Sequence, residues 1–253
     1  DMMPAENVTV VLSEKGWVKA AKGHEIDSSA LNYKSGDAFL KEAKGRSNKM
    51  AFFIDSSGRS YTLLANSLPS ARGQGEPLTG RLTPPIGAEF IDVVMGDDEQ
   101  LVILSSDAGY GFISTLGDLQ SKTKSGKHAI TLSKEAKTMR LTKVQNLESD
   151  YLAVITNRAR LLIFQVSELP HLSKGKGNKL INIKTDDFVA KEEFLIGLCI
   201  IKENQKLRVE YGNGKKHKQY SFSDLVNFTS HRARKGLTVP GVHGKALGID
   251  AID

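Results

Sequence analysis

The chain has 253 residues, a formal charge of +6 from 35 basic and 29 acidic side chains, and one cysteine. A single cysteine excludes an internal disulfide and is typical of a reducing cytoplasm. No apolar run reaches the length of about 18 residues that a membrane-spanning helix needs. The first seven residues carry two acids and no lysine or arginine, so we expect a linker there rather than a signal peptide.

Taken in order, the chain repeats a hairpin pattern. Each short run of β-branched and aromatic residues is followed by a turn and a second apolar run, which predicts a β-hairpin. The first runs span residues 8–12, 51–54, 101–104, 151–155 and 207–211. The turns contain Gly16, Gly58, Gly109, Ala159 and Gly214. Glycine takes positive φ without steric cost, so the turn at Ala159 is expected to be of another type or mildly strained.

The hairpins recur at nearly fixed spacing. Gly109 follows Gly58 by 51 residues, and Leu68, Leu119 and Leu169 each follow their turn by ten. Leu225 is the expected counterpart in the last unit. Four-strand units of this length are typical of propeller blades. We predict an all-β, propeller-like array of about five four-stranded blades in one domain, over residues 8–50, 51–100, 101–150, 151–205 and 206–253, with at most one short helix, within 187–199.

Basic and acidic residues occupy different phases of the repeat. Residues 120–134 and 171–184 each hold four lysines and no acid, whereas acids gather near 92–99, 148–150 and 186–193. One phase of a repeat array lies on one face, so the basic stretches are expected to form a band. Such a band, with glycines that permit close backbone approach, suits a phosphate backbone. The alternative is a solvated lysine face.

The basic stretches contain no interleaved aromatic residues, which favours duplex over single-stranded nucleic acid. We expect contacts to phosphates with little base specificity. Arg59 and Arg160 directly follow hairpin turns and are left out of this set. The candidates are Lys15, Lys19, Lys22, Arg72, Arg81, Lys122, Lys124, Lys127, Lys174, Lys176, Lys179, Lys215, Lys216, Arg232, Arg234 and Lys235.

The sequence offers little for catalysis. The six histidines have no paired ligand spacing, and no glycine-rich loop of the Gly-x4-Gly-Lys-Ser/Thr type is present. Cys199 lies in an apolar run and is interpreted as a core residue rather than a nucleophile. The acids at 97–99 are interpreted as a solvated loop. We therefore expect no catalytic residue, metal or cofactor in this chain.

Three segments resemble a known family. They are SLPSARGQGEPLTG (67–80), SDAGYGF (106–112) and LPHLSKGKGNK (169–179). They resemble the C-terminal domain of the A subunit of bacterial topoisomerase IV and, more distantly, that of DNA gyrase. The resemblance covers nearly the whole chain. It implies a β-pinwheel whose blades exchange strands with their neighbours, and a basic outer rim that bends duplex DNA.

The resemblance also implies a distinction within the family. The gyrase domain carries a glutamine, two arginines, two glycines, a lysine and a glycine in its first blade, and this box is needed for full wrapping. The nearest stretches here are ARGQG (71–75) and SKGKG (173–177). This implies the topoisomerase IV type, which bends DNA without wrapping it. The first and last repeats match the pattern more weakly, and Gly16 precedes Gly58 by only 42 residues, which favours a ring that is not fully closed.

The enzyme of this family passes one duplex through another and needs ATP and Mg. Its cleavage tyrosine follows an arginine, and none of the six tyrosines here does. The catalytic tyrosine and the ATPase are thus expected outside this chain. The implied role is to support decatenation and relaxation of supercoils, in the cytoplasm and associated with the nucleoid. The implied partners are duplex DNA, condensin-type proteins, and the enzyme's B subunit together with the rest of its A subunit.

Two other readings stay open at this point. A propeller-like scaffold with a basic band is also typical of a protein-interaction module that docks an acidic partner. An enzyme with its site in a central channel is the second, and a deep polar pocket would favour it.

Overall fold

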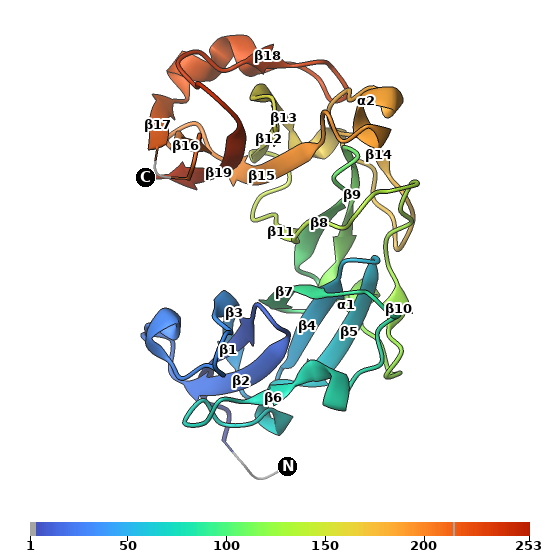
Figure 1. The fold of residues 1–253 in the computed structure, drawn as a ribbon, viewed down its shortest axis with the longest axis vertical. Coiled ribbons are helices and arrows are strands. Elements are labelled where there is room, and N and C mark those ends of the chain that lie inside the picture. The colour runs from blue at the N-terminus through green and yellow to red at the C-terminus, as the bar shows by residue number, and fades with distance from the viewer. Residues whose placement is uncertain (1–3, 215) are drawn as a thin grey trace. The chain divides into compact units, whose positions relative to one another are not determined.

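The computed structural model describes residues 4–214 and 216–253 (Figure 1). Its contacts divide the chain into two units. One comprises Asp1–Gln100, Thr115–Thr131 and Thr138–Leu141, and the other Leu101–Ser114, Leu132–Lys137 and Thr142–Asp253. The first unit holds two antiparallel sheets and the second holds three. The prediction of an all-β fold is confirmed.

Each sheet is built on a hairpin and a third strand. The first unit has β1 (Asn7–Ser13), β2 (Trp17–Lys22) and β3 (Phe39–Arg46), then β4 (Met50–Asp55), β5 (Arg59–Leu64) and β7 (Phe90–Met95). The second has β8 (Leu101–Ser105), β9 (Tyr110–Thr115) and β11 (Thr142–Lys143), then β12 (Tyr151–Thr156), β13 (Arg160–Gln165) and β15 (Leu195–Ile201), and finally β16 (Lys206–Tyr211), β17 (Lys216–Ser221) and β19 (Ala246–Ile252). The five predicted first strands are all found.

The hairpin turns use left-handed backbone. Gly16, Gly58 and Gly109 have φ of 82°, 94° and 90°, and Ala159 takes the same region with φ 62°. Alanine carries a Cβ that disfavours this conformation, so the expected mild strain at Ala159 is found. Its side chain is buried in the core of the second unit, which holds the turn in place.

The fourth strand of a sheet comes from the next repeat. β6 (Glu76–Pro77) pairs with β2, β10 (Lys127–His128) with β5, β14 (Asn178–Lys179) with β9, and β18 (Leu237–Thr238) with β13. Each of these two-residue strands ends its sheet, next to the second hairpin strand (Figure 1). Strand exchange between neighbouring repeats, which the resemblance implied, is therefore present.

The fifth sheet departs from the prediction of four strands in every blade. Among the described residues it contains three, in the order β17-β16-β19. The physical reason is the exchange itself, since each of the other four sheets takes its fourth strand from the repeat that follows it. The expectation of one domain with an open ring stays a prediction.

Each unit has its own apolar core. In the first, Val10, Phe53 and Tyr61 pack with Leu68 between the faces of the sheets. In the second, Ile155, Ile163 and Leu225 belong to one cluster. The four anchor leucines, Leu68, Leu119, Leu169 and Leu225, are all buried. Their role as core anchors of the repeat is confirmed.

The remaining elements are short. They are α1 (Leu116–Leu119), α2 (Thr185–Val189), and the 3-10 turns η1 (Ser28–Ala30), η2 (Ala65–Ser67), η3 (Leu78–Gly80), η4 (Val166–Glu168) and η5 (Ser223–Phe228). The helix expected within 187–199 begins and ends earlier, because residues 195–201 form β15 and place Cys199 opposite Ala153. The prediction of at most one short helix is wrong, because α1 forms a second one where Oγ1 of Thr115 accepts the amide hydrogen bond of Asp118. In the described part of the chain, no helix is both long enough and apolar enough to cross a membrane.

Candidate nucleic-acid interface

Four equivalent loops, which we call the basic loops, connect each sheet to the strand that it exchanges. They comprise residues 71–75, 120–126, 171–177 and 229–236. Three are aligned by the same parallel bridge to a preceding strand, in which Ala20 pairs with Ser70, Ile113 with His171 and Ile163 with Thr229. The remaining loop is held by the amide of Ser121, which donates to Oγ1 of Thr62 at 3.0 Å. The basic stretches of the sequence thus occupy one structural position in four successive repeats.

A glycine ends every basic loop. Gly75, Gly126, Gly177 and Gly236 all have positive φ, between 72° and 86°. A methyl group added to Gly126 would lie 2.7 Å from the carbonyl oxygen of Ser60, and one added to Gly236 would lie 2.6 Å from that of Leu161. Methyl groups added to Gly75 and Gly177 would lie closer still to the carbonyl oxygens of Val18 and Gly111. These four glycines therefore serve the approach of the loop to its neighbouring strand. The expectation that glycines permit close approach of a phosphate backbone stays a prediction.

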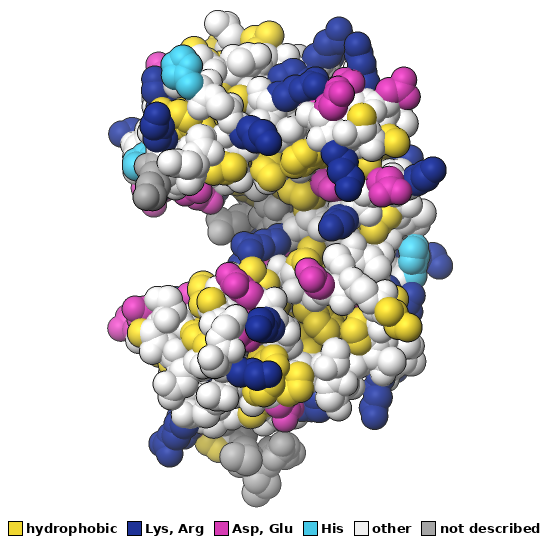
Figure 2. Space-filling model, in the orientation of Figure 1, with side chains coloured by type: hydrophobic (Ala, Val, Ile, Leu, Met, Phe, Trp, Pro, Cys, Tyr) yellow, Lys and Arg dark blue, Asp and Glu magenta, His cyan; other side chains and the backbone are white. Residues whose placement is uncertain are grey.

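The loops present cations and no acids. Their exposed basic residues are Arg72, Lys122, Lys124, Lys174, Lys176, Arg234 and Lys235. In the part of the chain that the structure describes, none of these seven has a carboxylate within salt-bridge distance. Figure 2 shows Lys and Arg side chains standing out from the surface of both units. Exposed cations without a carboxylate partner, on short loops, are suited to phosphate contacts.

Two arginines that directly follow hairpin turns hold these loops. Arg59 donates from Nε to the carbonyl of Ser125 at 2.8 Å and from Nη2 to that of Gly126 at 3.0 Å. Arg160 donates to the carbonyls of Lys235 and Asn182 and forms a salt bridge of 2.6 Å with Glu193. Sequence reasoning set both aside. Their identical place in the repeat was the signal that could have linked them to the loops.

The third hairpin carries a tyrosine at the equivalent position. Nζ of Lys176 lies 4.1 Å from the centroid of the Tyr110 ring, a cation–π contact that orients a loop lysine. In the first hairpin, Nζ of Lys34 lies 5.2 Å from the Trp17 ring. An aromatic residue therefore accompanies a basic loop in space although none lies in it in sequence.

Lys19 is not part of an accessible surface. It is 2% exposed, and its Nζ donates to the carbonyls of Asn32 and Gly73 and lies 4.3 Å from the Tyr33 ring. Burial lowers the pKa of Lys19, with a smaller opposing effect of Asp37. The side chain joins β2 to the first basic loop, so we withdraw Lys19 from the candidates for phosphate contact.

Four other candidates are half-buried and engaged within the protein. Arg81 bonds to Ser67 and forms a salt bridge of 3.3 Å with Glu76. Lys127 donates a hydrogen bond to the carbonyl of Asp118, and Lys179 donates one to Oδ1 of Asn182. Arg232 donates a hydrogen bond to the carbonyl of Lys179. Lys15 and Lys216 are exposed on a hairpin turn and a hairpin strand, away from the basic loops in sequence. Lys22 is exposed at the end of β2 and lines one pocket together with Arg72 of the first basic loop. Lys215 lies outside the described residues.

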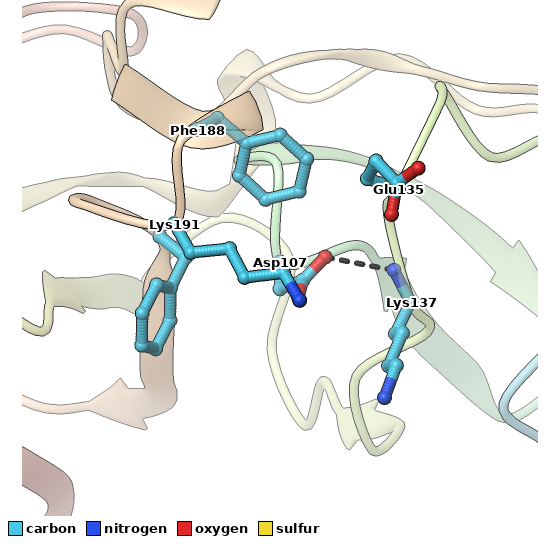
Figure 3. Close-up of a pocket in the computed structure, with 6 residues that line it drawn as sticks. Asp107, Glu135, Lys137, Phe188 and Lys191 are labelled. Atoms are coloured by element: carbon cyan, nitrogen blue, oxygen red, sulfur yellow. Dashed lines mark hydrogen bonds between the residues drawn. The ribbon is translucent and has the colours of Figure 1, made fainter. Parts of the chain in front are cut away.

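A separate pocket of about 250 Å³ lies in the second unit (Figure 3). Phe188 and Phe194 line it beside Asp107, whose carboxylate accepts a hydrogen bond of 2.8 Å from the backbone amide of Lys137. Burial raises the pKa of Asp107. Two lysines and a second carboxylate complete the lining, so its charges balance and no nucleophile is paired with a base. Among the described residues, no group of three or more His, Cys, Asp and Glu is placed to hold a metal ion.

Comparison with known proteins places this architecture in a family. A family model described as the DNA gyrase C-terminal domain, beta-propeller, matches residues 100–144 and 150–191. The solved structure of the E. coli ParC C-terminal domain aligns with a TM-score of 0.86 and 43% identity, over 97% of this chain and 98% of that one. A DNA gyrase A C-terminal domain aligns with a TM-score of 0.70 at 15% identity, covering 98% of this chain and 83% of that one, which shows the fold alone.

Relatives found by sequence comparison indicate the same family. The A subunit of DNA topoisomerase 4 from Pseudomonas aeruginosa is 49% identical over 240 residues, and that from Escherichia coli K12 is 45% identical over 242. These matches cover 95% and 96% of this chain and 32% of each relative, so the chain spans about a third of their length. The chain belongs to the family of C-terminal domains of the topoisomerase IV A subunit, ParC, which is part of a type IIA topoisomerase.

Proposed function

We propose that this chain is the part of a type IIA topoisomerase that binds and bends duplex DNA, through the four basic loops. The observation that carries the proposal is their equivalence. Four successive repeats present cations without a carboxylate partner at the same structural position. At one end of each loop a glycine permits close packing against the neighbouring strand, and in two loops an arginine also binds the main chain. A solvated lysine face does not require such fixed loops.

The contacts would be electrostatic. Lysine and arginine at loop tips neutralise phosphates and release condensed counterions, and this contribution to affinity is independent of base sequence. Within either unit, a duplex that contacts both basic loops must pass from one loop to the other. Bending a site of 20–30 base pairs by 40–90° costs about 1–6 kcal/mol, which several phosphate contacts offset.

The chemistry would lie elsewhere in the enzyme. The catalytic tyrosine, and the ATP and Mg that strand passage needs, belong in this proposal to the B subunit or to the rest of the A subunit. The domain would hold DNA and support decatenation and relaxation of supercoils, in the cytoplasm and on the nucleoid. A condensin-type protein is a further proposed partner.

A pair of matched variants tests the proposal. Lys122→Gln/Lys124→Gln removes two exposed charges from a basic loop, and Lys44→Gln/Lys49→Gln removes two exposed charges from the same unit outside the loops. We expect the loop variant to weaken binding of a 40-base-pair duplex by about tenfold at moderate salt, and the control by less than about threefold.

Equal losses from the two variants would refute the assignment to the loops. Preference for polyglutamate over duplex would instead favour a module that docks an acidic protein.

A further inference from the structure

The outer edge of β17 differs from the corresponding edge of the other sheets. β2, β5, β9 and β13 are each covered by a two-residue strand of the next repeat. β17 is the second hairpin strand of the fifth sheet, and among the described residues no strand pairs with its outer edge. In the other four sheets, the equivalent edge pairs with a two-residue strand of the following repeat.

The register identifies the residue at which pairing would occur. In the first, second, fourth and fifth sheets, pairing with the third strand shifts at the end of the first strand. The shift follows Leu12, Ile54, Ile155 and Glu210, whose partners across the hairpin are Val18, Ser60, Leu161 and His217. Val18, Ser60 and Leu161 each pair with the exchanged strand. His217 is therefore the equivalent acceptor.

The backbone of β17 is directed correctly for this pairing. Alternate peptide groups of an edge strand point away from its partner. In the first sheet the outward amide of Ala20 donates to the carbonyl of Pro69 at 2.8 Å, in the segment that leads into the first basic loop rather than in β6. By the same register the peptide groups of His217 and Gln219 point outward. The next outward amide, that of Ser221, already donates to Asp224 at 3.1 Å.

The side chains set the charge of a suitable partner. Lys216, His217, Lys218 and Gln219 are all exposed. One face of the strand is occupied near its end, because the Tyr220 hydroxyl donates to the carbonyl of Pro240 at 2.6 Å and Gly241 lies against Lys218. The edge with its lysines stays accessible and attracts carboxylates.

We propose that β17 binds an acidic, extended peptide segment of a partner protein as a fourth strand of the fifth sheet. By the same register, main-chain hydrogen bonds would form at His217 with the residue after the glycine of the segment, and at Gln219 with a residue that precedes this glycine as Pro69 precedes Gly75. These bonds would supply affinity, and the lysines would select acidic residues. By analogy with the four internal strands, the segment carries a glycine just before the residues that pair. This inference does not depend on DNA binding by the basic loops.

The lysines have a competing explanation. Charged residues on an edge strand also protect a sheet from pairing with other chains. That explanation predicts no peptide binding, so the same titration decides between them.

The test uses the intact chain and a synthetic peptide with Asp and Glu on both sides of one glycine. Fluorescence anisotropy would measure its affinity, and amide hydrogen exchange would locate it. We expect slowed exchange at His217 and Gln219, and affinity at least about tenfold above that of a lysine-containing peptide of the same length. Duplex binding, measured in parallel, should persist.

Two changes isolate the main-chain bonds. His217→Pro removes an outward amide that does not pair with β16, whereas His217→Ala keeps it. We expect the proline variant to bind the peptide about tenfold more weakly than the alanine variant. N-methylation of the peptide residue after the glycine leaves the protein unchanged and should weaken binding similarly.

Equal affinity of the proline and alanine variants, with no effect of N-methylation, would overturn the proposal. Protection of His217 and Gln219 that grows with protein concentration in the absence of peptide would also overturn it, because the edge would then belong to a second copy of the chain.

Discussion

The guanidinium of Arg59 donates a hydrogen bond of 2.8 Å to the carbonyl oxygen of Ser125, the residue that follows Lys124 in the second sheet's basic loop. Arg160 makes the same kind of contact with the carbonyl of Lys235. In both repeats an arginine fixes the backbone beside an exposed loop cation. The guanidinium groups thereby order the loops through contacts to their main chain.

Replacing Arg59 with methionine should weaken duplex binding through loop mobility. We expect the dissociation constant to rise about threefold, with the salt dependence nearly unchanged because no phosphate contact is lost. Faster amide exchange at Ala129, which donates to Gly58 in the folded chain, would report the loosened loop. Arg140→Met, at an exposed site of the same unit, is the control. A salt slope that falls by about one would show that Arg59 itself contacts phosphate.

Gly177→Ala should destabilise the second unit strongly. Gly177 has φ 80°, and an added methyl group would collide with the backbone of Gly111. We expect a loss of about 3 kcal/mol in the free energy of unfolding, measured with urea. Gly73→Ala changes a glycine with open space around its Cα and should alter stability by less than about 0.5 kcal/mol. Similar losses from both would contradict the close-approach argument.

Glu193→Gln should reduce stability at neutral pH and lose its effect in acid. Burial alone would raise the pKa of Glu193, but hydrogen bonds from Arg160 and Thr156 outweigh it and hold that pKa below the ordinary value of 4.5. Its contribution is therefore fully present above pH 4.5 and is lost as the pH falls through the folded-state pKa. We expect a loss of about 2 kcal/mol at pH 7.

Denaturation of wild type and variant at several pH values checks this. The two curves should converge in acid, whereas Glu192→Gln, at a side chain 58% exposed, should follow wild type throughout. A difference that stays constant down to pH 2 would exclude titration of Glu193 as the cause.

Lys19→Met should separate structure from DNA binding. The Nζ of Lys19 joins the carbonyls of Asn32 and Gly73 inside the first unit. Methionine leaves these carbonyls without a donor, so we expect a loss of about 2 kcal/mol in unfolding free energy and an unchanged salt slope for duplex binding. A reduced slope with unchanged stability would restore Lys19 to the interface.

The sequence predicted the repeat well because its signals are local. The hairpin turns at Gly16, Gly58 and Gly109 and the buried leucines follow from backbone sterics and apolar pattern. The sequence did not predict that the fifth sheet has three strands. A two-residue exchanged strand such as Glu76–Pro77 has no sequence pattern of its own, so its presence or absence in a given sheet could not be predicted. It forms only where another sheet offers an edge.

The candidate interface was predicted less completely. The basic loops were found from charge alone. The sequence did not reveal that Lys19 is buried, since alternation along β2 places residues on both faces and a lysine is normally exposed. The roles of Arg59, Arg160 and Tyr110 depend on contacts between repeats, which local pattern does not encode.

The measurement that tests the central claim most directly is duplex affinity across a salt series, for wild type and for Lys122→Gln/Lys124→Gln/Lys174→Gln/Lys176→Gln. With seven exposed loop cations, we expect the logarithm of the binding constant to fall with a slope of about −6 against the logarithm of salt concentration, independently of DNA sequence. The quadruple variant should have a slope of about −2 to −3. A flat dependence for wild type, or equal slopes for both proteins, would contradict the assignment of DNA binding to the basic loops.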